Sequence, residues 1–206
     1  MITSKNLYKL VLCSKIQEPT AINKWLISYP FLEKNVNWEK IYTLPYKITK
    51  ETYLHTFQFK ILNRILNCNE KLFTWGKVNT NTCSHCIDVD TIEHHLFYCP
   101  KSNNIWDCLS IWLTNHLQIN HNFTICEVIF GTITENNHQY FIINFLILIT
   151  KWHINKCKTN NLEIYFFDLL YTLKQKLETY LYNQTSEIIE DESNTGYWLR
   201  ELYNAL

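Results

Sequence analysis

The sequence is poor in the two residues that most often interrupt regular structure. Its 206 residues include only three glycines and four prolines. Sandwiches and barrels need frequent turns in which these residues predominate, so their scarcity argues against such folds and fits long helices. The chain is 47% hydrophobic and 15% aromatic, which is enough for a substantial core. We therefore expect a mainly α-helical bundle.

Long hydrophobic segments are also lacking. The most apolar run, 141–149, is interrupted by Asn144 and followed by Lys151 and His153, whereas a membrane helix needs about 20 apolar residues. The run fits a helix that is buried on most sides, and we expect no membrane contact. No signal peptide is evident, so we expect an intracellular protein, either nuclear or cytoplasmic.

The net charge of zero hides an uneven distribution. Residues 1–82 contain 12 Lys and Arg against 5 Asp and Glu, whereas residues 83–206 contain 7 against 14. The basic first part could face an acidic partner such as RNA or DNA, but a solvated lysine surface has the same composition and is the simpler interpretation of charge alone. The candidate phosphate contacts are Lys47, Lys50, Lys60, Arg64, Lys71 and Lys77.

Four candidate metal ligands lie close together in the sequence. Cys83, Cys86, His94 and Cys99 form the pattern C-x2-C-x7-H-x4-C. Three thiolates and one imidazole can complete a tetrahedral Zn²⁺ shell, and four protein ligands leave no position for a reacting water. We expect a structural zinc site within a segment at 83–106, joining the loop at 83–86 to a helix that begins near residue 91.

Two other histidines compete for the imidazole position. His95 changes the spacing to x8 and x3 and is the main alternative, whereas His85 lies between two cysteines and would strain the loop. Asp88 and Asp90 lie between the ligands. We expect them to be solvated, because carboxylates compete poorly with soft thiolates for zinc. The other five cysteines occur singly and fit buried free thiols.

Common catalytic motifs are absent from the sequence. It contains no H-E-x-x-H, no G-x-S-x-G, no glycine-rich phosphate loop and no adjacent aspartate pair. A zinc deaminase would need a proline before the C-x2-C pair, where this chain has Thr82. We therefore expect no enzymatic activity and no small-molecule substrate.

Hydrophobic periodicity predicts the helical segments. They are 5–15, 20–27, about 50–66, a short helix that ends at Gly76, about 91–113, 137–157, 162–183 and the last turns from 197. Residues 124–130 form a short element that ends at Gly131. The short connection between 137–157 and 162–183 predicts antiparallel neighbours. Because the segment after 184 is polar and acidic, we divide the chain into a helical domain, 1–184, and an acidic linker with a short C-terminal helix, 185–206.

The metal segment also matches a longer pattern. After the C-x2-C pair come an acidic residue and Thr at 90–91, His94, an apolar–aromatic pair at 96–97, Cys99, and Trp106 seven residues later. This order resembles the C-terminal zinc-binding region of non-LTR (LINE-type) retrotransposon reverse transcriptases, and the alignment selects His94 over His95. Further similar segments are 38–42, 50–52, 57–66, 127–131 and 151–158, so the resemblance covers about residues 5–183.

The resemblance implies a non-catalytic accessory domain that binds template RNA or target DNA during target-primed reverse transcription. Its partner would include the rest of a retrotransposon polyprotein. The polymerase and endonuclease regions are absent from these 206 residues, so we expect no RNA copying. The alternative function is a zinc-stabilised protein-interaction or scaffold module from a domesticated or decayed element, in which the acidic second half and the apolar helices bind a polypeptide.

Overall fold

The structure is a computed structural model that describes residues 4, 6–8, 11, 18–34, 36–132, 139–182 and 194–206. It is mainly helical, as predicted. The helix expected at 5–15 falls largely outside the described residues. So does the acidic segment up to residue 193.

The chain divides into two compact units, residues 1–36 and 37–206, a boundary that the sequence did not indicate. In the first unit, α2 (Thr20–Ser28) precedes the 3-10 helix η1 (Pro30–Lys34). Trp25 is fully buried there, and its ring stacks on Tyr29.

The second unit contains the candidate metal ligands and nine described helices: α3 (Trp38–Ile48), α4 (Thr52–Leu62), α5 (Asn69–Thr74), η2 (His94–Tyr98), α6 (Pro100–Leu117), α7 (Ile125–Phe130), α8 (Tyr140–Thr159), α9 (Phe166–Tyr182) and α11 (Asn194–Ala205).

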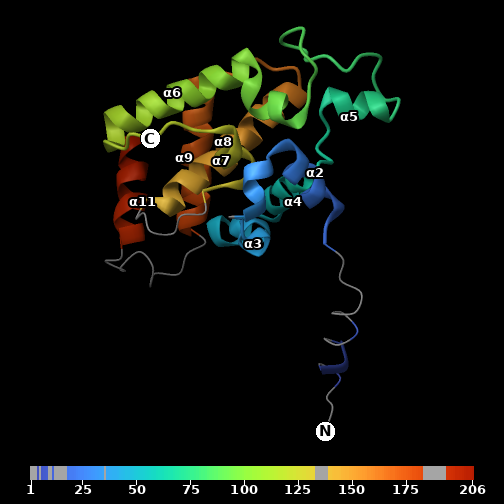
Figure 1. Ribbon diagram of the computed structural model, residues 1–206. Coiled ribbons are helices and arrows are strands. Elements are labelled where there is room, and N and C mark those ends of the chain that lie inside the picture. The colour runs from blue at the N-terminus through green and yellow to red at the C-terminus, as the bar shows by residue number, and fades with distance from the viewer. Residues whose placement is uncertain are drawn as a thin grey trace. The chain divides into compact units, whose positions relative to one another are not determined.

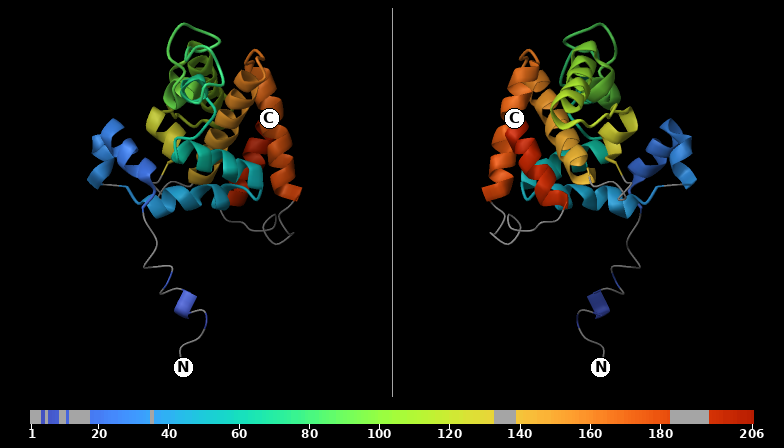
Figure 2. Two further views of the ribbon diagram at one scale, coloured as in Figure 1. Left: turned by 90° about the vertical axis from the view of Figure 1, so that its right-hand side faces the viewer. Right: turned by 90° about the vertical axis from the view of Figure 1, so that its left-hand side faces the viewer.

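Helix α8 is the centre of the second unit (Figures 1 and 2). It packs against α3, α4, α7, α9, α11 and η2, and every residue from 142 to 151 is buried, which explains why its sequence is apolar on all sides. Helix α9 follows after a short connection and buries only one face, with leucines at 169, 173 and 177. No described helix is long and apolar enough to cross a membrane.

The end of the chain forms a longer helix than the one predicted from residue 197. Helix α11 begins at Asn194 and packs against α6 and α8. Leu199 and Leu202 are buried, so this helix belongs to the core of the second unit. The predicted domain boundary at 184/185 lies outside the described residues.

The helix predicted from about 91 to 113 is interrupted. It begins with a π-helical turn, η2, and α6 starts separately with Pro100 at its first position. Proline fits a first helical position because its missing N–H would have no intrahelical partner there. Before η2, the described residues form no strand, and a single antiparallel bridge joins Thr82 to Val89.

Candidate metal centre

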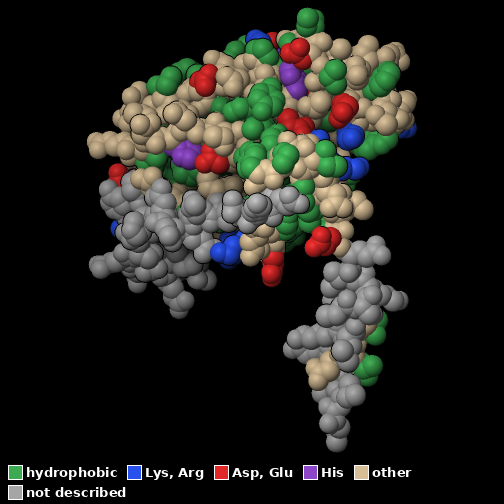
Figure 3. Space-filling model, in the orientation of Figure 1, with side chains coloured by type: hydrophobic (Ala, Val, Ile, Leu, Met, Phe, Trp, Pro, Cys, Tyr) green, Lys and Arg blue, Asp and Glu red, His purple; other side chains and the backbone are tan. Residues whose placement is uncertain are grey.

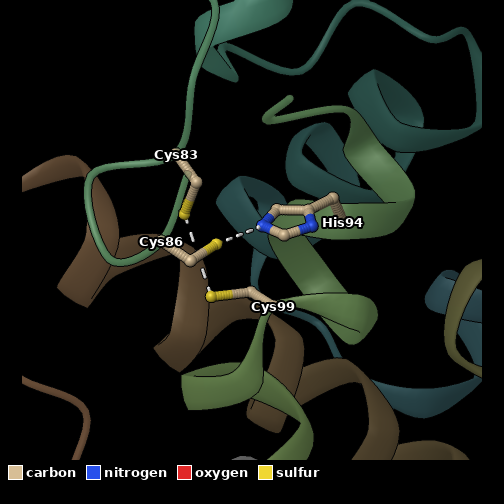
Figure 4. A group of neighbouring side chains, drawn as sticks. All are labelled: Cys83, Cys86, His94 and Cys99. Carbon is tan, nitrogen blue, oxygen red and sulfur yellow. Dashed lines mark hydrogen bonds between the residues drawn. The ribbon is translucent and has the colours of Figure 1, made fainter. Parts of the chain in front are cut away.

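The four predicted ligands converge at one point (Figure 4). One ligand atom each from Cys83, Cys86, His94 and Cys99 lies within 4.8 Å of the other three. Cys83 Sγ is 3.8 Å from Cys99 Sγ, and Cys86 Sγ is 3.1 Å from His94 Nε2. Three of the residues are buried and Cys86 is partly exposed. The cluster could therefore hold a metal ion.

The distances can be compared with those of a tetrahedral shell. Zinc–sulfur bonds of about 2.3 Å at tetrahedral angles place two sulfurs about 3.8 Å apart, and a zinc-bound sulfur and nitrogen about 3.6 Å apart. The Cys83–Cys99 distance matches the first value, and the Cys86–His94 distance is somewhat shorter than the second. A disulfide would need about 2.05 Å between the sulfurs, so the Cys83–Cys99 distance fits two separate ligands.

A short hairpin presents the first two ligands. The bridge between Thr82 and Val89 closes it, and the Cys83 N–H donates to the Asp88 carbonyl at 2.8 Å. The His85 N–H points to Cys83 Sγ at 3.5 Å, so His85 supports a ligand through its backbone. The hairpin thus turns both thiols toward η2.

The π-helical turn presents the other two ligands. Cys99 follows His94 by five positions, which is more than the 3.6 residues of one α-helical turn. The Cys99 N–H donates to the His94 carbonyl at 2.9 Å, an i→i+5 bond that closes the wider turn and returns Cys99 to the side of His94. Thr91 Oγ1 accepts the His94 N–H at 3.1 Å and caps the turn. The ligand spacing required a distorted helix start, and this turn provides it.

The wider turn leaves main-chain carbonyls that need other partners. The His95 carbonyl accepts from Ser102 Oγ at 2.9 Å and from Lys158 Nζ at 3.2 Å. The Leu96 carbonyl accepts from Trp106 Nε1 at 2.8 Å. Trp106 therefore stabilises the turn that carries His94. This gives a physical reason for a tryptophan seven residues after Cys99.

Asp90 is buried, which corrects the expectation that it is solvated. Only 3% of the residue is exposed. Its carboxylate accepts the Asn69 N–H at 2.9 Å, lies 3.1 Å from His95 Nδ1 and lies 3.7 Å from Lys158 Nζ. Burial acts to raise the pKa of Asp90, but His95, Asn69 and Lys158 together hold it below its usual value. Asp88 is exposed, as predicted.

The same contacts distinguish the two competing histidines. His94 Nε2 faces Cys86, whereas His95 Nδ1 faces Asp90. The structure thus places His94, and not His95, among the three thiols. The Asp90–His95–Lys158 network lies behind the metal cluster and connects it to α5 and α8. Sequence reasoning missed Lys158, which is 59 residues from Cys99 and has no local signal.

Cys99 lies at the N-terminus of α6, where thiolates are stabilised. Burial acts to raise the pKa of Cys99, but the Lys158 charge and the N–H groups of Ser102 and Lys101 outweigh it, so the pKa is lowered. For Cys86, burial and the neighbouring thiols raise the pKa to about 11. Metal binding removes such thiol protons, because the thiolate is the ligand form.

The six candidate nucleic-acid contacts are distributed over three places. Lys47 lies in the last turn of α3 and Lys50 lies between α3 and α4, Lys60 and Arg64 lie at the end of α4, and Lys71 and Lys77 lie in and after α5. Arg64 forms an ion pair with Glu93 at 2.9 Å and is only partly exposed. On the face in Figure 3, basic side chains lie in small groups among acidic and uncharged ones.

Comparison of the chain with protein-family models, curated proteins and solved structures gives no match. The resemblance to the LINE-type zinc-binding region rests on the residues described above. Several of those residues make contacts that stabilise the elements around the metal cluster. Thr91 caps η2, Asp90 binds His95, and Trp106 binds the Leu96 carbonyl.

Proposed function

We propose that Cys83, Cys86, His94 and Cys99 hold Zn²⁺, and that the chain is a non-catalytic nucleic-acid-binding domain. The domain would derive from the C-terminal region of a LINE-type reverse transcriptase. In such a protein it would support the binding of template RNA or target DNA. The convergence of the four ligands, in the order and spacing of that region, carries the proposal.

The donor set favours zinc over harder metals. Thiolates and imidazole are the ligands that zinc prefers in structural sites, whereas magnesium and calcium prefer oxygen. A bound Zn²⁺ would fix the hairpin at 83–86 to the start of α6, because each element supplies ligands. Four protein ligands leave no position for a substrate, which supports a structural role.

The proposed nucleic-acid binding depends on lysines outside the metal cluster. Four of these lysines are exposed, namely Lys47, Lys50, Lys60 and Lys77, and Lys71 is partly exposed. All five lie in the basic first part of the sequence, residues 1–82. Their ammonium groups would contact phosphates and release counterions from the strand. Arg64 is the weakest candidate for a phosphate contact, because its guanidinium is paired with Glu93.

The test combines metal analysis with salt-titrated binding. We expect one zinc per purified chain and binding of labelled single-stranded RNA or DNA that weakens steeply with salt. Cys86→Ser should lose the metal and lower the melting temperature, whereas Cys108→Ser, which changes a partly exposed thiol of α6 outside the cluster, should do neither. A chain without zinc, or with no salt-dependent binding of any nucleic acid, would contradict the proposal.

Exposed apolar side chains near the hairpin support a second candidate, a protein-interaction module. Phe73 and Trp75 are each 48% exposed, and Ile87 is 92% exposed. Large apolar side chains that are exposed to solvent are the groups from which protein-binding surfaces are built. Under this alternative, the chain would bind zinc but no nucleic acid. Replacing Trp75 and Ile87 with serine would then abolish partner binding without changing the zinc content.

A further inference from the structure

A groove between α4 and α8 combines aromatic and basic side chains. Its volume is about 290 Å³, and its described lining includes Tyr53, Phe57, Lys60, Asn67, Trp152 and Asn155. That volume is close to the lower limit of roughly 300–1,000 Å³ for small-ligand pockets, so it suits one nucleoside better than a large ligand. The groove is open to solvent, which allows a chain to continue beyond it.

Tyr53 and Trp152 form the aromatic wall of this groove, and hydrogen bonding holds Tyr53 in place. The Tyr53 hydroxyl donates to Glu51 Oε2 at 2.7 Å, and the Tyr53 ring lies 5.5 Å from the Trp152 ring, centre to centre. Tyr53 is 40% exposed and Trp152 is partly exposed. The ring planes are inclined at 55° to each other, so a base that stacks on Trp152 would meet Tyr53 at its edge.

Positive charge surrounds this wall. Lys60 is exposed in the groove itself, and the ammonium groups of Lys156 and Lys176 lie 5.3 and 5.4 Å from the centre of the Trp152 ring. The described lining contains no acidic side chain. Glu51 lies beside it, but its charge is compensated by Lys176 at 2.8 Å. Aromatic faces within a basic groove are the combination that single-strand-binding proteins use.

A neighbouring groove provides a contrast. It has a volume of about 380 Å³ and also contains Lys156, but Glu163 and Asp168 line it. Two carboxylates oppose a polyanion, so its larger size does not make it the better site for a nucleic-acid strand.

One polar group in the first groove lacks a partner. Asn155 Oδ1 is inaccessible to solvent and accepts no hydrogen bond in the described structure. A rotation of this amide would present the acceptor to a ligand donor. The ribose 2′-hydroxyl is such a donor, and it is the group that separates RNA from DNA.

We propose that this groove binds single-stranded RNA, with one unpaired base stacked on Trp152 and in edge contact with Tyr53. The ammonium groups of Lys60 and Lys156 contact the adjacent phosphates, and the stacked base replaces the cation–π contact of exposed Lys156 with Trp152, which is weak at an exposed site. This inference rests on the proposed nucleic-acid binding and specifies its site. It shifts the binding residues from the five lysines and one arginine of the first half of the sequence to a mixed set that includes residues of the second half.

The experiment measures fluorescence anisotropy with the full chain and a labelled single-stranded RNA of about 12 nucleotides, within the roughly 4–16 that such sites cover. We expect Trp152→Leu to weaken binding by roughly 5- to 150-fold, the effect of losing one stacked base. Lys60→Gln and Lys156→Gln should each lower the slope of log affinity against log salt by about 0.7. Both lysines are exposed, so these variants test the groove even if Trp152→Leu fails to fold.

Lys24→Gln and Lys40→Gln are the matched controls, because both lysines are exposed and neither lines the groove. Loss of binding in Lys71→Gln and Lys77→Gln, with Lys60→Gln and Trp152→Leu unchanged, would overturn the groove while leaving the proposed nucleic-acid binding intact. Equal affinity for DNA of the same sequence would overturn RNA as the occupant. Equal affinity for duplex RNA would overturn the stacking of an unpaired base. Absence of salt-dependent binding to all of these probes would overturn both the groove and the proposed function.

Discussion

The indole N–H of Trp106 donates to the main-chain carbonyl of Leu96 at 2.8 Å. This bond joins the second turn of α6 to the π-helical turn that carries His94. Both groups are buried, so the carbonyl has no solvent to replace the indole. A side chain outside the four-residue cluster thus supports the geometry of the metal cluster.

Trp106→Phe should destabilise the fold by about 1–3 kcal/mol, the usual cost of an unpaired buried polar group. It should also weaken metal binding, because η2 loses a support. Trp112→Phe is the control, since Trp112 is also on α6 and its ring stacks on His116. Urea denaturation and chelator competition measure the two effects. Equal metal affinity in both variants would contradict the role given to Trp106.

His94→Gln and His95→Gln separate a metal ligand from its neighbour. We expect His94→Gln to lose most of the bound metal, because it removes one of four ligands. His95→Gln should keep one metal per chain but lose stability, because buried Asp90 loses a partner. Metal content after dialysis and thermal melting give the two readouts. If metal is lost only in His95→Gln, then His95 is the ligand and the placement of His94 is wrong.

Lys151 predicts a pH dependence of stability. Burial lowers its pKa from 10.5 to about 7, and its Nζ donates to the Val128 carbonyl at 2.9 Å. Between pH 7 and 10.5 the unfolded chain therefore binds more protons at this lysine than the folded chain, so the free energy of unfolding rises with pH, by at most about 1.4 kcal/mol per pH unit. Lys151→Met should remove this contribution.

The measurement is urea unfolding of the parent and Lys151→Met from pH 7.5 to 8.5. The difference between the two proteins isolates Lys151, because both retain the metal cluster. We expect the parent to gain about 1 kcal/mol relative to the variant over this range. Lys156→Met, at an exposed position on α8, should follow the parent. Parallel curves for the parent and Lys151→Met would show that this lysine does not titrate as described.

Two glycines with left-handed backbones make a matched pair. Gly131 has φ 81° and Gly76 has φ 67°. A Cβ on Gly131 would overlap Leu44 Cδ2 and lie 2.8 Å from Asn144 Oδ1, whereas a Cβ on Gly76 would meet nothing within 4 Å. Gly76→Ala should cost about 1–2 kcal/mol through backbone strain. Gly131→Ala should cost a further ~1–3 kcal/mol through overpacking, and equal melting temperatures would contradict this.

The metal ligands were predictable because residue type and spacing are local properties. Spacing alone could not choose between His94 and His95. That choice depends on the direction of each side chain from η2, which the fold determines. Asp90 was misjudged for a related reason. Its partners Asn69 and Lys158 come from distant parts of the sequence, so nothing near Asp90 indicates its burial.

The fold shows the same division between local and distant causes. Periodicity predicted α8 and α9 well, because their apolar patterns reflect the faces they bury. It predicted one helix from 91 to 113, although Pro100 offered a signal for the break that the structure shows. The segment around Trp38 was not assigned as a helix, yet α3 runs past Pro45, with Asn37 accepting the Lys40 N–H at its start.

The network behind the cluster limits how far the zinc segment can be treated as a module. A peptide of residues 81–106 contains all four ligands, the hairpin and Trp106. It lacks Lys158, which bonds the His95 carbonyl from α8, and Asn69, whose N–H bonds Asp90. Grafted onto another scaffold, it would carry a buried carboxylate and a π-helical turn without these two partners. The segment is continuous in sequence but not autonomous in structure, and insertions or recombination at its borders would have to preserve the end of α8 as well.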